Sequence, residues 1–374
     1  MDIYVVKKGD TLYRIAREFG LSVNQLIEIN QLSNPDRLIV GQSLIIPVRR
    51  QPDILVNGYT YPNINRTTLR NTLPYLTYLS IFSYQVTPHG TLRPINDEAL
   101  IEEALNQQVA PMLVVTNIGE SGRFESDLAH LIFNDMAVQD QLVESILKVL
   151  QEKNYYGVDL DFEYVYPMDR ALYNRFLKRM ADTLHPLGYT LTTALAPKVR
   201  YDQPGILYEA HDYYAHGKYA DHVILMTYEW GYRYGPPMAV APINQVERVL
   251  NYALTVIPSE KILMGIPNYG YDWTLPYQEG TAANSISNTQ ALELAIQKGA
   301  EIQFDSVSQS PYFYYKDNDQ NLHVVWFEDA RSIQAKLNLV DKYKLGGISF
   351  WTIMNYFPQG YWILDHQFTV QKLV

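Results

Sequence analysis

Eight short apolar segments, separated by stretches with helical periodicity, run through residues 53–374 of this 374-residue chain. Between the third and fourth segments, for example, Leu142, Ile146 and Leu150 share one helical face. Strands that alternate with helices over this length build a closed parallel sheet, because a helix covers each apolar strand. The pattern therefore predicts an α/β fold, a (β/α)8 TIM barrel. Its predicted strands are Ile54–Tyr59, Tyr78–Phe82, Met112–Thr116, Gly157–Phe162, Thr190–Ala194, His222–Thr227, Ile262–Ile266 and Gly347–Phe350.

One stretch, residues 273–328, does not follow this alternation. It contains one helical segment and three strand-like segments, and Asp317–Asn321 supplies the polar turn of a hairpin. We expect a small α+β insertion between the seventh and eighth barrel strands. Its predicted elements are the helix Ala291–Lys298 and the strands Ile302–Asp305, Tyr312–Lys316 and Leu322–Phe327.

The first 48 residues form a separate pattern, in which two helices lie between two strands. Gly9, Asp10 and Thr11 end the first strand and cap the first helix. The pattern predicts a βααβ domain over residues 1–48, a polar linker over 49–52 and a second domain over 53–374. The predicted elements are the strand Ile3–Val6, the helices 11–19 and Ser22–Asn30, and the strand Gln42–Pro47.

The composition excludes several kinds of function. A net charge of -10 argues against nucleic acid or an anionic membrane as a partner, because both attract basic surfaces. The chain has no cysteine, and its eight histidines show no metal-ligand spacing, so we expect neither a metal nor a cofactor. No apolar run reaches the ~20 residues of a membrane span. The N-terminus lacks the pattern of a secretory signal, and we expect no conventional export.

Three carboxylates alternate with apolar residues along the fourth predicted strand and at its end: Asp159, Asp161 and Glu163. Successive side chains of a strand point to opposite faces, so the three acids share one face. Like charges on one face repel, and their pKa values are expected to rise. Barrel residues at the carboxyl ends of the strands form active sites, so a protonated Glu163 there is suited to act as a general acid.

The segment Tyr156–Glu163 resembles the Asp-Gly-x-Asp-x-Asp-x-Glu signature of glycoside hydrolase family 18, the chitinase-type barrels. Three further segments match the family in order and strand position: Met226–Glu229, Gly265–Gly270 and Gly346–Trp351. The family also carries a small α+β insertion between strands seven and eight. The resemblance covers roughly residues 53–374.

The chain departs from the family pattern at three places. Tyr156 replaces the first Asp of the signature, and Glu229 replaces the Asp of the strand-six motif. Residues 116–119, Thr-Asn-Ile-Gly, are a weak match to the strand-three Ser-x-Gly-Gly motif. These changes affect contacts to the substrate and leave the matching catalytic acids in place.

The resemblance implies substrate-assisted hydrolysis with retention of configuration, without an enzyme nucleophile. Glu163 corresponds to the general acid that protonates the glycosidic oxygen and later activates water. The substrate's own 2-acetamido carbonyl attacks the anomeric carbon, Asp161 orients that group, and Asp159 tunes Asp161. Tyr228 corresponds to the residue that donates a hydrogen bond to the acetamido oxygen. The cleaved sugar must then be N-acetylated.

The resemblance also suggests which residues bind the substrate. Trp351, at the end of the eighth strand, corresponds to the aromatic floor under the cleaved sugar. Trp230 and Trp273 are candidates for outer sugar subsites. Further candidates for the central pocket are Tyr59, Asn117, Met226, Tyr269 and Glu229.

The βααβ pattern of the first 48 residues resembles a LysM domain over its full length. LysM domains bind polymers that contain N-acetylglucosamine, namely peptidoglycan or chitin. By this resemblance the loops around residues 10–12 and 30–32 form the glycan groove. The candidate glycan-binding residues are Gly9, Asp10, Thr11, Leu12, Asn30 and Leu32.

The combination of a LysM domain with this barrel is similar to spore peptidoglycan N-acetylglucosaminidases of endospore-forming bacteria. It implies a monomeric, spore-associated or cell-wall enzyme that cuts N-acetylglucosamine linkages in spore cortex or its fragments. A chitinase or chitooligosaccharidase is one alternative. An inactive chitinase-like lectin is another, although such proteins lose the acid that Glu163 provides here.

Overall fold

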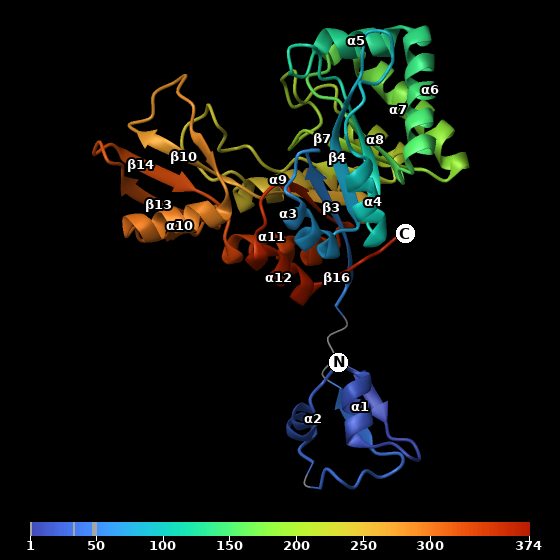
Figure 1. Ribbon diagram of the computed structural model, residues 1–374, viewed down its shortest axis with the longest axis vertical. Helices are drawn as coiled ribbons and strands as arrows, with labels where there is room; N and C mark the ends of the chain where they lie inside the picture. Colours follow the sequence, from blue (N-terminus) through green and yellow to red (C-terminus); the bar gives the residue numbers. More distant parts are fainter. Residues whose placement is uncertain (1, 33, 47–50) are drawn as a thin grey trace. The chain divides into compact units, whose positions relative to one another are not determined.

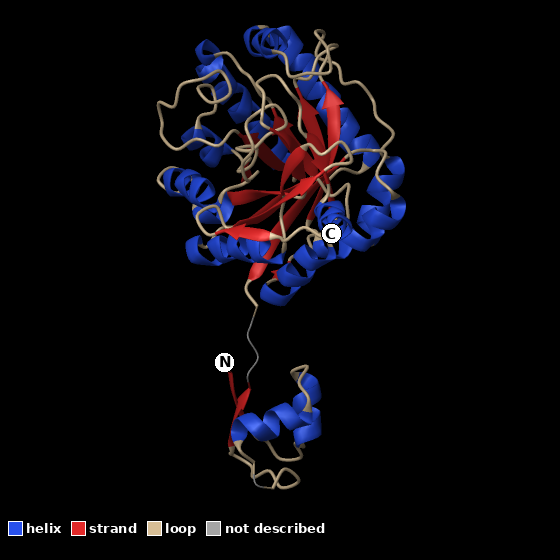
Figure 2. Cartoon of the chain, turned by 90° about the vertical axis from the view of Figure 1, so that its left-hand side faces the viewer, coloured by secondary structure: helices blue, strands red, loops and turns tan. Residues whose placement is uncertain are grey.

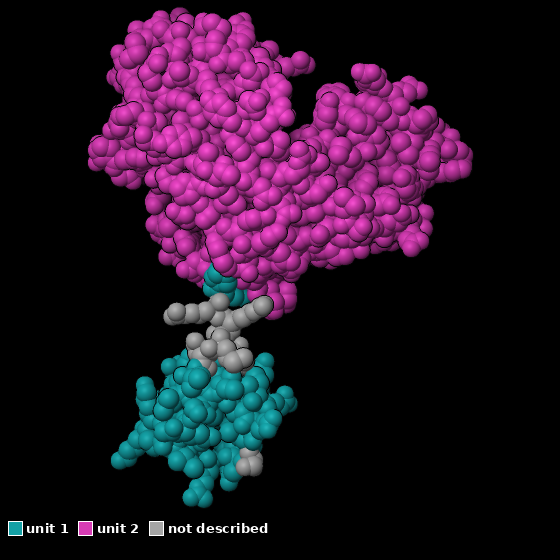
Figure 3. Space-filling model, turned by 180° about the vertical axis from the view of Figure 1, so that it is seen from behind, with its two compact units in different colours: residues 1–52 teal, residues 53–374 magenta. Residues whose placement is uncertain are grey.

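The computed structural model describes residues 2–32, 34–46 and 51–374. The chain divides into two compact units, residues 1–52 and 53–374, which Figure 3 colours separately. Residues 49 and 50 of the predicted linker lie outside the described residues, as do Val48 and Pro47, the last residue of the predicted closing strand. Each unit has a hydrophobic core of its own.

The smaller unit has the predicted βααβ order, with the two strands paired antiparallel. Thr11 and Ser22 begin the two helices, and each side-chain oxygen accepts a hydrogen bond from a backbone N–H in the first turn. Ser22 and Gln25 form a reciprocal capping box. The elements are β1 (Asp2–Val5), α1 (Leu12–Glu18), α2 (Val23–Asn30) and β2 (Ser43–Ile46).

The larger unit is a closed barrel of eight parallel strands, which confirms the predicted fold class. Each strand pairs with the next in sequence order, and β15 pairs with both β9 and β3 to close the ring. Figure 2 shows the strands in red inside a layer of blue helices. The barrel strands are β3 (Asp53–Thr60), β4 (Tyr78–Gln85), β5 (Ala110–Thr116), β6 (Gly157–Asp161), β7 (Thr190–Leu195), β8 (His222–Leu225), β9 (Ile262–Pro267) and β15 (Gly347–Trp351).

The covering helices bury one apolar face each against the barrel. On α6 the predicted stripe of Leu142, Ile146 and Leu150 is buried, as periodicity requires. A short strand, β16 (Thr369–Val370), extends the sheet beside β3 near the C-terminus. The helices are α3 (Arg66–Thr72), α4 (Glu98–Asn106), α5 (Ser126–Asn134), α6 (Met136–Lys153), α7 (Arg170–Leu184), α8 (Tyr213–Tyr219), α9 (Ile243–Ala253), α11 (Ala330–Tyr343) and α12 (Pro358–Gln367), with short 3-10 turns at η1 (Leu73–Tyr75), η2 (Pro167–Asp169), η3 (His185–Leu187) and η4 (Ser259–Lys261).

The predicted insertion is present between β9 and β15 and projects from the barrel as a separate lobe (Figure 1). It is a five-stranded antiparallel sheet in the order β11-β10-β14-β13-β12, with α10 packed on it. Two of its strands, β10 and β11, were not predicted, and β10 begins before residue 273. Because β10 pairs with β14 some 50 residues later, its strand character depends on distant residues. The elements are β10 (Gly270–Leu275), β11 (Asn284–Ile286), α10 (Asn288–Lys298), β12 (Gln303–Asp305), β13 (Ser310–Lys316) and β14 (Leu322–Trp326).

Two barrel strands end earlier than predicted. β6 ends at Asp161 and β8 ends at Leu225, so Glu163 and Tyr228 lie in loops just beyond the sheet. After β8 the chain turns at once, because the N–H of Thr227 bonds to the carbonyl of Leu225. These early ends bring both side chains to the mouth of the barrel. In the described part of the chain, no helix is both long enough and apolar enough to cross a membrane.

Candidate active site

A cavity of about 1240 Å³ lies at the carboxyl ends of the barrel strands. Residues from the loops after most of the barrel strands line it, together with Tyr271 and Ser285 from the insertion. The cavity therefore lies where barrel and insertion meet, and the surface of the larger unit in Figure 3 is notched between two lobes. This is the position at which TIM barrels carry their active sites.

Asp159 is the innermost acid of the triplet and does not line the cavity. Its carboxylate is fully buried and accepts hydrogen bonds from the Tyr59 hydroxyl at 2.5 Å and from Thr192 Oγ1 at 2.7 Å. Burial raises the pKa of Asp159 to about 6, although both hydrogen bonds act against that rise. Tyr59, predicted as a pocket residue, lines the cavity and reaches Asp159 through its hydroxyl.

Asp161 is buried at the cavity floor, and its Oδ1 atom has no hydrogen-bond partner among the described residues. Burial, and then the charges of Glu163 and Asp159, raise the pKa of Asp161 well above its ordinary value. A buried carboxylate oxygen without a partner costs free energy. Since Asp161 lines the cavity, a donor group of a bound molecule can satisfy it.

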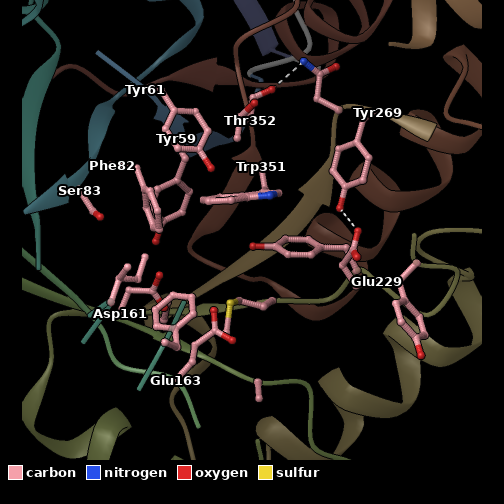
Figure 4. A pocket seen from close by; sticks show the side chains of 18 of the residues that line it. Tyr59, Tyr61, Phe82, Ser83, Asp161, Glu163, Glu229, Tyr269, Trp351 and Thr352 are labelled. Atoms are coloured by element: carbon pink, nitrogen blue, oxygen red, sulfur yellow. Dashed lines mark hydrogen bonds between the residues drawn. The ribbon is translucent and has the colours of Figure 1, made fainter. Parts of the chain in front are cut away.

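Glu163 lies half-buried in the loop after β6 and faces the cavity. In Figure 4 it lies on the same side of the cavity as Asp161, opposite the ring of Trp351. Burial raises the pKa of Glu163 to about 7, so the carboxyl is protonated in a large fraction of molecules at neutral pH. The side chain can therefore donate a proton to a molecule in the cavity.

Two side chains hold the backbone around Glu163. The Asn117 amide bonds to both the N–H and the carbonyl of Glu163, at 3.0 and 2.9 Å. His211 accepts from the N–H of Ala196 at Nδ1, so its Nε2 carries the proton and donates to the carbonyl of Phe162 at 2.9 Å. Asn117 is fully buried and does not line the cavity, which corrects its prediction as a pocket residue.

Trp351 lines the cavity, as the resemblance predicts, and its ring lies in the middle of the view in Figure 4. Its ring packs edge to face against Tyr59 and Phe82, with centroids 5.3 and 5.1 Å apart, and Tyr61 joins the same cluster. Asn268 bonds to the backbone after this tryptophan, at Thr352 O. The packing holds the indole ring as one wall of the cavity.

Tyr228 and Met226 follow β8 and line the cavity, as predicted. Glu229 also lines it, and its carboxylate accepts hydrogen bonds from the hydroxyls of Tyr269 and, at 3.0 Å, Tyr271. Tyr271 belongs to β10, so Glu229 links the barrel mouth to the insertion. All four of the predicted acids and Tyr228 therefore lie in or directly beneath one site.

The predicted outer-subsite tryptophans do not line the cavity. Trp273 is buried on β10, where its Nε1 donates to the Gly235 carbonyl at 2.9 Å, so its prediction was wrong. Trp230 is half-buried and packs against the core.

The sequence analysis also missed several aromatic residues that line the cavity. Tyr164 directly follows Glu163 and was detectable from that position. The others have no such signal: Tyr61, Tyr208 and Tyr232 lie in loops, Phe82 lies on β4 and Tyr271 on β10.

In the smaller unit several predicted glycan-binding side chains have structural partners. Asp10 Oδ2 accepts from the Tyr4 hydroxyl and the Lys7 N–H, both at 2.7 Å. Asn30 exchanges hydrogen bonds with the backbone of Ile45, and Leu12 is buried. These side chains shape the loops. Of the remaining candidates, Gly9 has a φ of 89°, Thr11 caps α1 and Leu32 is half-buried.

The described residues contain no cluster of histidine and carboxylate side chains that could hold a metal ion. The cavity instead offers a proton donor, the buried carboxylate of Asp161, tyrosine hydroxyls and aromatic walls. This set suits acid–base chemistry on a sugar, whose pyranose faces can stack on aromatic rings.

The family model described as Glycosyl hydrolases family 18 matches residues 59–355, and the LysM domain model matches residues 4–47. The chain belongs to glycosyl hydrolases family 18. Family 18 membership and the LysM domain confirm the resemblance drawn from the acid triplet and the N-terminal pattern. The chain is thus a glycoside hydrolase.

Two similar proteins align with nearly the whole chain, and a third aligns with most of it. The cortical fragment-lytic enzyme of Bacillus subtilis (strain 168) is 40% identical over 430 residues, covering 100% of this chain and 99% of that protein. The solved spore cortex-lytic enzyme SleL of Bacillus cereus is 40% identical with a TM-score of 0.85, covering 99% of this chain and 87% of that one. The solved structure of a chitinase from Chromobacterium violaceum is 26% identical with a TM-score of 0.79, and the match covers 84% of this chain and 98% of the chitinase.

Proposed function

We propose that this enzyme hydrolyses N-acetylglucosamine linkages of spore cortex peptidoglycan or its fragments, with retention of configuration and with the substrate's acetamido group as nucleophile. The observation that carries the proposal is the buried, unpartnered Oδ1 of Asp161 beside the near-neutral Glu163. An acetamido N–H at this oxygen would satisfy it and would turn the acetamido carbonyl toward the anomeric carbon.

In the first step Glu163 donates its proton to the glycosidic oxygen as the bond to the anomeric carbon breaks. The acetamido oxygen bonds to that carbon and forms an oxazolinium ion, whose positive charge the Asp161 carboxylate stabilises. Tyr228, buried beside this site, donates a hydrogen bond to the acetamido oxygen. The ionised Glu163 then takes a proton from water, which attacks the same carbon from the face that the leaving group left.

Asp159 acts through Asp161. Its oxygens are held by Tyr59 and Thr192, so its carboxylate keeps a fixed distance from Asp161 and influences how readily Asp161 ionises. Asp159 is therefore a positioning and tuning residue, while Asp161, Glu163 and Tyr228 contact the substrate. Trp351 stacks under the N-acetylated sugar.

Two similar proteins that align with nearly the whole chain are named as a cortical fragment-lytic enzyme and a spore cortex-lytic enzyme, and these names support spore cortex as the glycan. We further propose that the enzyme is spore-associated and that the LysM domain holds it on glycan that contains N-acetylglucosamine. That the enzyme is a monomer stays a prediction.

The likeness to a chitinase favours chitin oligomers as a second candidate substrate. A lectin function is not favoured, because Glu163, Asp161 and Tyr228 all line the cavity.

The test is mass analysis of products from spore cortex fragments, vegetative peptidoglycan and chitin oligomers. We expect cleavage of cortex fragments at N-acetylglucosamine, and none by Glu163→Gln, which should still bind the fragments. Wild-type turnover by Glu163→Gln would overturn the mechanism. Cleavage of chitin oligomers with intact cortex fragments would favour the second candidate.

A further inference from the structure

The aromatic rings that line the cavity fall into two groups. The first group, Trp351, Tyr59, Tyr61 and Phe82, is packed ring against ring, with centroids between 5.1 and 6.4 Å apart. These rings are held by one another and form a continuous wall. The proposed function places the N-acetylated sugar against this wall.

The second group consists of Tyr164, Tyr208 and Tyr232, which we call the open tyrosines. Tyr164 and Tyr232 are 41% and 43% exposed, and Tyr208 is half-buried. Among the described residues, none of their rings packs on another aromatic ring, and none of their hydroxyls has a hydrogen-bond partner. Each ring thus presents an apolar surface and a free hydroxyl to the cavity.

The open tyrosines are nevertheless held in place. Tyr164 has a φ of 54°, a left-handed conformation that is costly for a tyrosine, and Ser126 Oγ donates to its carbonyl at 2.5 Å. The Tyr232 ring lies against Gly235, where a Cβ atom would approach Tyr232 Cε1 to 2.4 Å. The Tyr208 ring lies in the same way over Gly205, where a Cβ atom would approach Tyr208 Cδ2 to 3.1 Å. The rings of Tyr208 and Tyr232 therefore lie against the backbone of glycines in their own loops.

The two groups lie on opposite sides of the barrel mouth. The packed wall comes from the ends of β15, β3 and β4, whereas the open tyrosines come from the loops after β6, β7 and β8. In the closed order of eight strands, β7 is four strands from β3 in either direction. Glu163 precedes Tyr164 directly, so the proton donor lies on the same side as the open tyrosines.

We propose that Tyr164, Tyr208 and Tyr232 form the subsite for the sugar on the leaving side of the cleaved bond. The inference rests on the proposed function, in which Glu163 protonates the oxygen between two sugars. With the N-acetylated sugar on the Trp351 wall, the next pyranose lies across Glu163. The C–H face of that sugar stacks on the open rings, and its hydroxyls take the free tyrosine hydroxyls as partners.

The experiment compares two substrates that share the N-acetylated sugar. Spore cortex fragments have a sugar as leaving group, whereas β-N-acetylglucosaminyl fluoride has a single atom that cannot reach the open tyrosines. The measured quantity is the ratio of kcat/KM for the fragments to kcat/KM for the fluoride. Tyr208→Ala, Tyr232→Ala and Tyr232→Phe are compared with the control Tyr214→Ala, which alters a 61% exposed tyrosine on α8 outside the cavity.

We expect each alanine variant of an open tyrosine to lower the ratio about 2- to 10-fold, the scale of one aromatic contact. Tyr232→Phe keeps the ring, so its ratio should be more than half of the wild-type ratio. Tyr214→Ala should have the wild-type ratio. Turnover of the fluoride shows that each variant is folded. An unchanged ratio in both alanine variants would overturn the subsite. Wild-type enzyme inactive on the cortex fragments would overturn the proposed function instead.

Discussion

The side-chain amide of Asn117 holds both backbone polar groups of Glu163. Its Oδ1 accepts from the Glu163 N–H at 3.0 Å, and its Nδ2 donates to the Glu163 carbonyl at 2.9 Å and to the Glu125 carbonyl at 3.1 Å. One buried amide at the end of β5 thus fixes the loop after β6 that carries the general acid. Only a group with a donor and an acceptor in one plane can make these contacts.

Asn117→Ala should lower kcat about 10- to 100-fold with a smaller change in KM, because the proton donor loses its fixed position. Steady-state kinetics on cortex fragments would show this split. Asn65→Ala is the matched control, since Asn65 caps α3 through two backbone N–H groups and does not line the cavity. Equal losses of kcat in both variants would mean that Asn117 contributes only to stability.

The pH dependence of activity should follow the protonation of Glu163. Its pKa is raised to about 7, and the protonated form is the active one, so kcat/KM should fall as the pH rises above 7. The limiting slope is about tenfold per pH unit. Initial rates between pH 5 and 9 test this. A rate that stays constant to pH 9 would contradict the assignment of Glu163 as the acid.

The buried Asp159 should make the barrel less stable as the pH rises. Its pKa in the folded state is about 6 against an ordinary value of 3.8, so the folded state binds more protons between these values. With respect to this group the free energy of unfolding is therefore highest below pH 3.8, and it falls as the pH rises from there through about 6. The loss amounts to about 3 kcal/mol.

Asp159→Asn removes this titration and should gain stability relative to wild type between pH 4 and 7. Urea unfolding followed by tryptophan fluorescence measures the barrel alone, because all five tryptophans lie within residues 53–374. A difference between variant and wild type that is the same at pH 4 and pH 7 would contradict the prediction.

A buried ion pair connects the insertion to the barrel. Lys336 Nζ on α11 lies 2.7 Å from Glu328 Oε2 just after β14, and both side chains are only 1% exposed. Lys336→Met should destabilise the larger unit by about 3–5 kcal/mol, because it leaves the Glu328 carboxyl buried without its cation. The double variant Lys336→Met with Glu328→Leu should recover most of this loss. Equal unfolding free energies for the single and double variants would argue against the pairing.

The LysM unit should act in adsorption. Deletion of residues 1–48 leaves the larger unit with its own core, so cleavage of soluble fragments should persist. Adsorption to insoluble peptidoglycan should weaken, because the glycan-binding module is missing. A sedimentation assay with insoluble wall material measures the bound fraction, and equal adsorption of both forms would contradict the anchoring role.

Local patterns were sufficient for most of the fold. The barrel strands and the predicted insertion helix are continuous apolar or periodic segments, so their identity follows from neighbouring residues. The strand β10 was missed because it pairs with β14 some 50 residues later, and β11 is only three residues long. Trp273 was misplaced because its burial depends on Gly235 in a loop of the barrel.

The sequence by itself determined that Asp159 and Asp161 share one strand face and that Glu163 follows them at a barrel mouth, because alternation in a strand is a local property. The tertiary structure alone decided how these acids differ. Asp159 is buried under Tyr59 and Thr192, Asp161 keeps an unpartnered oxygen, and Glu163 lies in a loop held by Asn117. Burial and hydrogen bonds from other strands set these environments, and residues distant in sequence supply both.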